Sequence, residues 1–243
     1  MAFRLMSVTR CGLVMPVTLM FGMASAADAA ILFNATTDFS ATLNPNGAWS
    51  YGQTATLGGS FSPLLAGSCG PLTGWNSSGA SATGGSPPFI FKGVGTCGTG
   101  TLTSGELDLH PGSAGQYADV RWTAPGAGSF VVTGFFTGID PHPTTTDVHV
   151  LQNSAALFNG AVASLGMPLS FSLTGTVAAG DRLQFVVGFG QDGDFGFDST
   201  AFNAEISFQP SAAIPEPGSI VLLGTGLLIV VRRLRQKRAS VAR

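Results

Sequence analysis

Charged side chains are scarce in this sequence. Asp, Glu, Lys and Arg together make up 10% of its 243 residues, against about 25% in an average soluble domain. Helical bundles need many charged residues on their exposed faces, and the 34 glycines would be costly inside helices. The composition therefore disfavours a helical fold. Simple disorder is disfavoured as well, because 18 phenylalanines and 44% apolar residues can build a core.

Basic side chains are rare in the middle of the chain. Residues 31–210 contain eleven acidic side chains but only Lys92, Arg121 and Arg182 as bases, which gives a net charge of about −8. The whole chain has a net charge of only −2, because six basic residues lie in the last twelve positions. Nucleic-acid binding needs clustered Lys and Arg against phosphates. We therefore expect no nucleic-acid partner for the central region.

Residues 1–29 have the three-part layout of a secretory signal peptide. Arg4 and Arg10 form a basic start, an apolar stretch covers residues 11–23, and small residues offer A-x-A cleavage sites at 24–26 and 27–29. An N-terminal membrane anchor is the alternative, but the apolar stretch is short for a span. The sequence predicts export by the secretion machinery.

The end of the chain combines a proline-rich motif, an apolar run and a basic cluster. In order, these parts are Pro215-Glu216-Pro217, the apolar run 220–231 and the basic cluster 232–238. As a helix, the apolar run would rise about 18 Å, against a hydrocarbon core of about 30 Å. With flanking residues and snorkelling arginines, a short transmembrane helix at about 219–231 is feasible. The positive-inside bias then predicts that the basic tail, 232–243, stays in the cytoplasm.

This ordered tail resembles the PEP-CTERM sorting signal of Gram-negative bacteria, over residues 213–238. The same region is also catalogued as an ice-binding-protein C-terminal domain, a label that describes the tail and not an activity. The resemblance implies recognition by exosortase, a membrane transpeptidase-like enzyme, with Pro215, Glu216 and Pro217 as recognition residues and removal of the tail nearby. It implies transport across the inner membrane, transient anchoring, and display at the cell surface or outside the cell. A plain single-pass anchor is the alternative.

Between residues 30 and 210, apolar and polar residues alternate in short runs. These runs lie at 116–122, 130–136, 148–151, 170–174, 183–187 and 206–208. A period of two without any helical period predicts an all-β fold, namely a single antiparallel β-sandwich that is jelly-roll-like. Residues 56–88 and 93–105 are rich in Gly, Ser, Thr and Pro, and we predict that they are long surface loops.

Several segments of this region share a second likeness. They are residues 44–52, 109–112, 121–125 and 144–150. Together they resemble a domain that recurs in exported PEP-CTERM proteins, over about residues 38–207. Its layout is similar to the jelly rolls of carbohydrate-binding modules, in which aromatic side chains face sugar rings. This resemblance implies a fold but no assigned activity.

Two cysteines, Cys69 and Cys97, remain once a signal peptide is removed. In an exported protein such a pair predicts a disulfide more strongly than a metal site. Closing the loop between them would add about 3 kcal/mol of stability in the chain-entropy model.

The segment 192–198 is the densest acidic stretch. Asp192, Asp194 and Asp198 are separated by glycines and phenylalanines, and oxygen ligands at such positions suit Ca²⁺. They are the candidate ligands for a structural calcium ion, and no other cofactor is expected. An ordinary solvated turn is the simpler alternative.

Tryptophans are the candidates for binding a ligand. Trp75 stands in the polar segment 74–78, where we expect an exposed ring that can stack on a sugar. Trp49 and Trp122 are further candidates, with core positions as the alternative.

Catalytic residues are not evident in the sequence. It has no G-x-S-x-G motif, and His142 lies between two prolines in an expected loop. The sequence therefore predicts a non-catalytic exported surface or matrix protein that binds glycan or exopolysaccharide. A purely structural matrix or adhesion protein is the alternative. A polysaccharide hydrolase with paired carboxylates is a further one.

Overall fold

The computed structural model describes residues 29–163, 165–211 and 217–241. Apart from Ala29, the predicted signal peptide lies outside the described residues, as do Pro215 and Glu216 of the predicted sorting motif. The signal peptide therefore stays a prediction.

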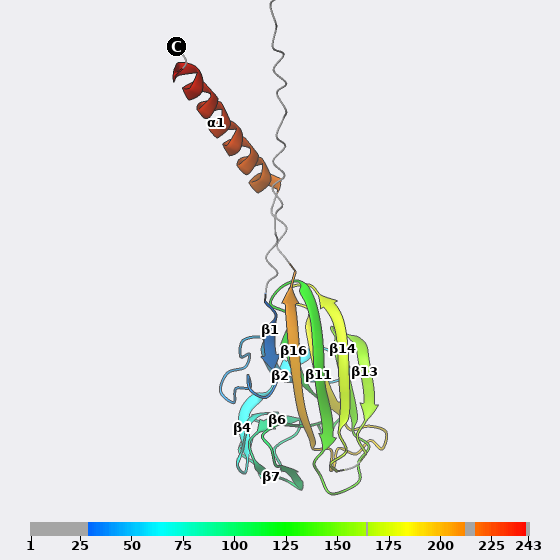
Figure 1. Ribbon diagram of the computed structural model, residues 1–243. Coiled ribbons are helices and arrows are strands. Elements are labelled where there is room, and N and C mark those ends of the chain that lie inside the picture. The colour runs from blue at the N-terminus through cyan, green and yellow to red at the C-terminus, as the bar shows by residue number, and fades with distance from the viewer. Residues whose placement is uncertain (1–28, 164, 212–216, 242–243) are drawn as a thin grey trace, which may run out of the picture.

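Two antiparallel β-sheets pack face to face (Figure 1). Sheet A has the spatial order β14 (Leu169–Val177), β11 (Gly128–Gly138), β16 (Thr200–Pro210), β9 (Leu107–His110), β6 (Phe89–Lys92), β5 (Leu72–Asn76) and β4 (Leu65–Cys69), and β1 (Ile31–Asn34) also pairs with β16. Sheet B has the order β13 (Ala155–Ala161), β12 (Asp147–Gln152), β15 (Arg182–Gly188), β10 (Tyr117–Thr123), β2 (Trp49–Thr54) and β3 (Phe61–Pro63). A hairpin of β7 (Gly95–Cys97) and β8 (Gly100–Leu102) stands apart from both sheets. The predicted all-β sandwich is confirmed.

The main core lies between the sheets and is rich in aromatic rings. The ring centroids of Phe136 and Phe202 are 5.1 Å apart, and those of Phe185 and Phe202 are 5.0 Å apart. Each core strand contributes every second side chain, as the period of two requires. The buried core residues all lie between positions 35 and 208. The segment 29–211 therefore contains its own complete core.

A smaller core lies on the opposite face of sheet A, beneath the β7–β8 hairpin. Its members are Cys69, Leu72, Phe89, Phe91, Cys97, Leu102, Ile139 and Ala201. Ile90 and Phe202 belong to the main core while their neighbours Phe91 and Ala201 belong to this one, so the two cores lie on opposite sides of the sheet. A disulfide joins Cys69 to Cys97 across a Cα–Cα distance of 5.4 Å. This confirms the predicted pairing and ties β4 to the hairpin.

The prediction of long loops at 56–88 and 93–105 is wrong in part. These segments contain β3, β4, β5, β7 and β8. The glycines in these segments interrupt the alternation of apolar and polar residues, but they allow paired strands to approach closely. A Cβ on Gly74 would lie 2.4 Å from the carbonyl oxygen of Ile90. Close strand approach therefore outweighs the low β-propensity of glycine here.

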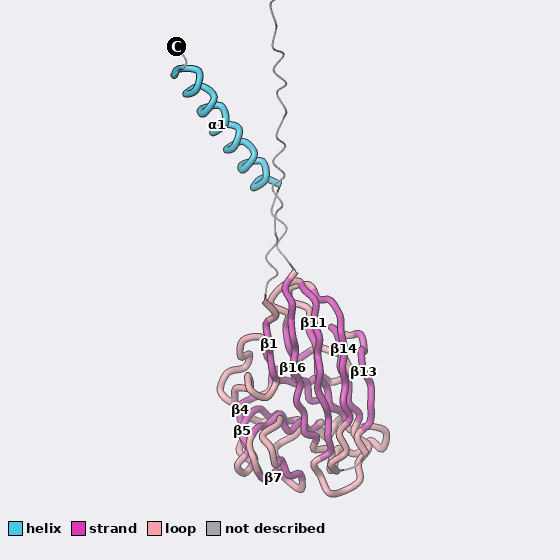
Figure 2. The backbone as a smooth tube through the Cα atoms, in the orientation of Figure 1, coloured by secondary structure: helices cyan, strands magenta, loops and turns pink. Residues whose placement is uncertain are grey.

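The tail forms one helix, α1 (Pro217–Val241), which Figure 2 shows in cyan. The expected helix at 219–231 is present, but it does not end before the basic segment. Arg, Leu, Gln, Lys and Ala are good helix formers, so the helix continues through that segment. Within the described ranges, no helix has the length and apolar character needed to cross a membrane. Membrane insertion of the tail stays a prediction.

Candidate functional site

Trp75 lies on strand β5, and its predicted place in an exposed loop is wrong. Its ring is 5% exposed and stacks on Tyr51, with a centroid distance of 6.2 Å and an interplanar angle of 7°. Its Nε1 donates a hydrogen bond to the Ser40 carbonyl oxygen at 2.8 Å. Trp49 and Trp122 are also fully buried in the main core. None of the three rings offers a face to a ligand.

Asp192, Asp194 and Asp198 do not form the predicted calcium site. Asp192 and Asp194 are exposed, and each accepts a hydrogen bond from the backbone N–H two residues further on, at 3.1 and 2.9 Å. Asp198 is buried and accepts the hydroxyls of Thr144 and Thr146 instead. In the part of the chain that the structure covers, no group of three or more His, Cys, Asp or Glu side chains could hold a metal ion. The aspartates stabilise the loop because they bond its own backbone.

The same loop contributes Phe197 to an exposed aromatic pair with His142 of the loop 139–146, and we call this pair the loop platform. The two rings stack with their centroids 4.1 Å apart and an interplanar angle of 30°. Phe197 is 40% exposed, and the His142 side chain is 49% exposed. Phe197 also has a φ of 69°, an uncommon conformation for a bulky residue and one often found at functional sites.

Buried polar groups hold the loop platform in place. The Oδ1 atom of Asp140 lies 2.7 Å from the His142 Nδ1 and accepts the His142 backbone N–H at 3.0 Å. Asp140 is itself buried, so the imidazole is fixed from behind. On the other side of the pair, Asp198 anchors the loop, because its carboxylate accepts the hydroxyls of Thr144 and Thr146. Burial raises the pKa of the Asp198 carboxyl to about 6, although these two hydroxyls oppose the shift. The platform is therefore pre-organised.

The sequence reasoning missed Phe197 because it weighed only Trp and Tyr as ligand-stacking residues. The available signal was the segment 192–198 itself. Gly and Asp favour turns and so place both Phe195 and Phe197 in a loop, but the sequence does not tell which ring is exposed: Phe195 is partly buried, whereas Phe197 is 40% exposed.

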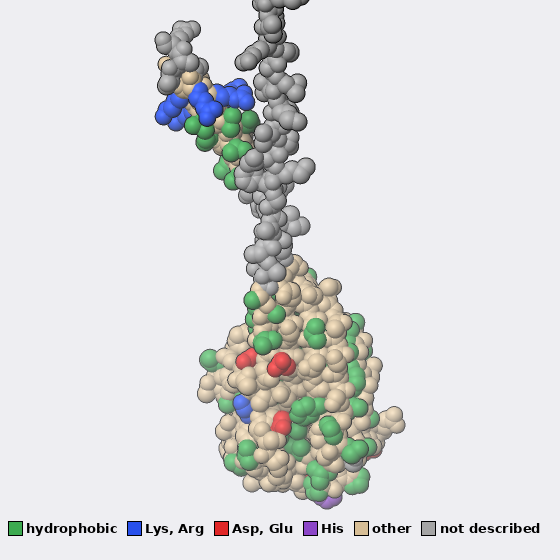
Figure 3. Space-filling model, viewed as in Figure 1, with side chains coloured by type: hydrophobic (Ala, Val, Ile, Leu, Met, Phe, Trp, Pro, Cys, Tyr) green, Lys and Arg blue, Asp and Glu red, His purple; other side chains and the backbone are tan. Residues whose placement is uncertain are grey.

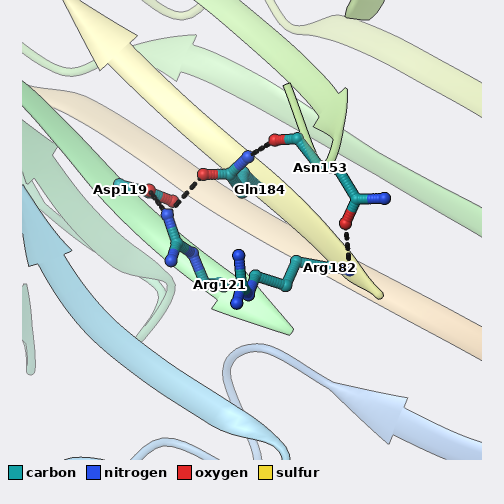
Figure 4. Close-up of polar contacts among 5 residues, drawn as sticks. All are labelled: Asp119, Arg121, Asn153, Arg182 and Gln184. Carbon is teal, nitrogen blue, oxygen red and sulfur yellow. Dashed lines mark hydrogen bonds and ion pairs between the residues drawn. The ribbon is translucent and has the colours of Figure 1, made fainter. Parts of the chain in front are cut away.

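A polar network on the outer face of sheet B is structural in character (Figure 4). Arg121 Nη2 donates to Asp119 Oδ2 at 2.9 Å and also to Gln184. Gln184 in turn donates to the Asn153 carbonyl oxygen. The Phe61 ring covers the guanidinium at 4.1 Å, and the Asp119 side chain is 0% exposed. Burial raises the pKa of Asp119 to about 6, with Arg121 opposing the shift. A ligand has no access to this ion pair.

The comparison with protein families concerns the tail. The family model of the PEP-CTERM protein-sorting motif matches residues 213–236. The chain carries a PEP-CTERM sorting motif. The resemblance inferred from the sequence is therefore confirmed. The motif indicates an exported protein that is sorted to the cell surface, and it implies processing by exosortase. A search of curated proteins found no match for the chain.

Solved structures are similar to the sandwich of this chain only at a distance. A family 35 carbohydrate-binding module from Clostridium thermocellum is 12% identical, with a TM-score of 0.31, and the match covers 49% of this chain and 85% of that one. The family 51 module from Clostridium perfringens, solved with methyl-galactose, is 19% identical with a TM-score of 0.32, over 49% and 87% of the two chains. A tailspike protein of bacteriophage CBA120 is 13% identical with a TM-score of 0.35, over 72% and 20%. No conclusion about a ligand rests on such distant likenesses.

The outer face of sheet A, where the smaller core lies, contains a buried acid, Asp108. Its side chain is fully buried, and neither carboxyl oxygen makes a hydrogen bond of ordinary geometry within the described residues. Burial raises the pKa of Asp108 to about 8. The nearby Ser199 hydroxyl and Thr200 N–H offset part of this shift, whereas repulsion from the Asp140 carboxylate adds to it. Asp108 is therefore neutral in the folded protein at pH 7.

Asp108 should make the stability of the domain fall as the pH rises. Between about pH 4 and pH 8 the unfolded chain releases the Asp108 proton while the folded domain keeps it, so ionisation favours unfolding. Asp108→Asn cannot ionise, so we expect its melting temperature to match that of the wild type near pH 4 and to exceed it by more than about 3 °C at pH 8. Calorimetry at both pH values measures this difference. A constant difference at both pH values would contradict the expectation.

Proposed function

We propose that residues 30–210 form a non-catalytic glycan-binding domain, displayed on the surface of a Gram-negative bacterium after exosortase removes the PEP-CTERM tail. The observation that carries this proposal is the loop platform: an exposed aromatic pair whose orientation buried groups fix in advance. Glycan sites use such rings because the C–H faces of a sugar pack against them.

Polar groups beside the platform suit sugar hydroxyls. Asp192 and Asp194 lie exposed in the same loop, and their carboxylates can accept hydrogen bonds. Within the described residues the His142 Nε2 has no partner, so it is free to bond a ligand. The ring pair supplies the apolar surface and these groups supply orientation, the division of roles expected in a small-ligand site.

Phe197→Ala should weaken glycan binding about tenfold. The substitution removes the exposed ring from the stack, and the loss of about 1.4 kcal/mol corresponds to tenfold in affinity. A glycan array selects the best oligosaccharide for the domain 29–211, and titration calorimetry then measures its affinity. Asp140→Asn should also weaken binding, since it loosens His142 without touching the ligand.

Leu43→Ala is the matched control, because Leu43 is an exposed loop side chain outside the platform. It should bind as the wild type does. If the wild-type domain binds no glycan, a purely structural role replaces the proposal. If it releases reducing sugar from the bound glycan, the domain is a hydrolase.

A further inference from the structure

A second surface, on the outer face of sheet A, has a chemistry of its own. Strands β14, β11 and β16 send their apolar side chains to the main core and the alternate ones outward. The outward residues that the hairpin does not cover are Ser170, Ser172, Thr174, Thr176, Ser129, Val131, Thr133, Phe135, Thr137, Asn203, Glu205, Ser207 and Gln209. The strand register sets them in rows, such as Ser172–Thr133–Glu205 and Ser170–Phe135–Asn203. We call this surface the hydroxyl face.

The hydroxyls of this face are free to bond a ligand. Within the described residues, the side-chain hydroxyls of Ser129, Thr133, Ser170, Ser172 and Thr174 have no hydrogen-bond partner, and all five residues are exposed. Because these hydroxyls are exposed, they can bond water or a ligand without breaking a hydrogen bond of the fold.

The hydroxyl face is hollowed on either side of Phe135. One hollow, of about 420 Å³, is lined by Thr133, Ser170 and Asn203 among others. The other, of about 260 Å³, is lined by Thr137 and Thr101 among others. Phe135 lines both, so the hollows adjoin and leave an aromatic edge between two depressions that have mixed polar and apolar linings. An adjoining pair of depressions suits successive units of a chain molecule.

The charge of the hydroxyl face restricts the partner. Glu205 is the only charged residue among the outward positions of β11, β14 and β16, Glu106 lines the smaller hollow, and the face in Figure 3 shows few charged side chains. The domain as a whole has a net charge of about −8, which repels an anionic polymer. Leu32, which pairs with Ser207, joins Val131 and Phe135 as an apolar side chain of this face, so a second copy of the chain is the competing partner and sedimentation tests for it.

We propose that the hydroxyl face docks a long neutral polysaccharide, independently of the loop platform. Each sugar unit would exchange hydrogen bonds with the free hydroxyls, and Phe135 would pack against a ring. Such contacts are individually weak and gain strength with the number made by one chain. Binding should therefore increase with polymer length and change little with salt.

Affinity electrophoresis of the domain 29–211 tests this docking. Gels are cast with hydroxyethyl cellulose or dextran as neutral polymers, and with alginate as the anionic one. We expect retardation by at least one neutral polymer, about equal at low and high salt, and none by alginate. Thr133→Val/Ser172→Ala/Thr174→Val removes three hydroxyls and keeps the two threonine positions β-branched. It should reduce retardation at least fivefold.

Matched substitutions separate this surface from the rest of the domain. Ser50→Ala/Ser62→Ala/Thr123→Val removes three hydroxyls from sheet B and should leave retardation unchanged, with circular dichroism confirming both folds. Phe197→Ala should also leave it unchanged, so failure of the platform and failure of this proposal are distinguishable. The proposal is overturned if no neutral polymer retards the domain, if alginate retards it equally, or if the hydroxyl-face variant is retarded as the wild type is. It is also overturned if sedimentation shows a dimer that this variant dissociates.

Discussion

Trp75→Ala is expected to destabilise the domain by about 3–5 kcal/mol, the usual cost of truncating a large buried aromatic residue. The ring is almost fully buried, stacks on Tyr51 and donates a hydrogen bond to the Ser40 carbonyl oxygen. Its loss leaves a cavity in the main core and an unpaired acceptor. Urea unfolding of the domain 29–211, followed by fluorescence, measures the free energy of unfolding.

Trp75→Phe is the graded control for this substitution. It keeps an aromatic ring against Tyr51 but loses the Nε1 donor, so it should cost less than the alanine variant. If the Trp75→Ala domain instead keeps wild-type stability but binds no glycan, Trp75 is an exposed sugar-stacking residue, as the sequence predicted.

Asp119→Ala should destabilise the domain by a similar amount, about 3–5 kcal/mol. Removing one partner of a buried ion pair leaves the other charge without compensation. Arg121 would keep Gln184 as a partner but would lose its counter-ion beneath the Phe61 ring. Chemical unfolding at pH 7 measures the loss.

Asp119→Leu/Arg121→Met separates the cost of the unpaired charge from the value of the pair. Replacing both charges with apolar groups of similar size is often neutral or better, so the double variant should be more stable than Asp119→Ala alone. An Asp119→Ala domain within about 0.5 kcal/mol of the wild type would mean that solvent reaches Arg121, and the cluster would then be open to ligands.

The sequence predicted those parts of the molecule whose signals are local. Strands β10 and β14 were predicted from a strict alternation of apolar and polar residues, and β15 from apolar residues at every second position, because a strand that buries one face needs a period of two. The disulfide between Cys69 and Cys97 followed from an exported chain with two remaining cysteines. The PEP-CTERM motif is likewise a contiguous pattern, read without any fold.

The tertiary structure alone decided which side chains are exposed. Trp75 stands among polar and small residues in the sequence, yet neighbouring strands bury it. Phe197 stands in an acidic loop. His142, from a loop more than fifty positions earlier, stacks on the Phe197 ring, and Asp140 holds the His142 ring in place. The hydroxyl face also depends on pairing between distant strands, since register places Thr133 beside Ser172 and Glu205. Burial and juxtaposition arise from contacts far apart along the chain, and a local pattern carries no information about them.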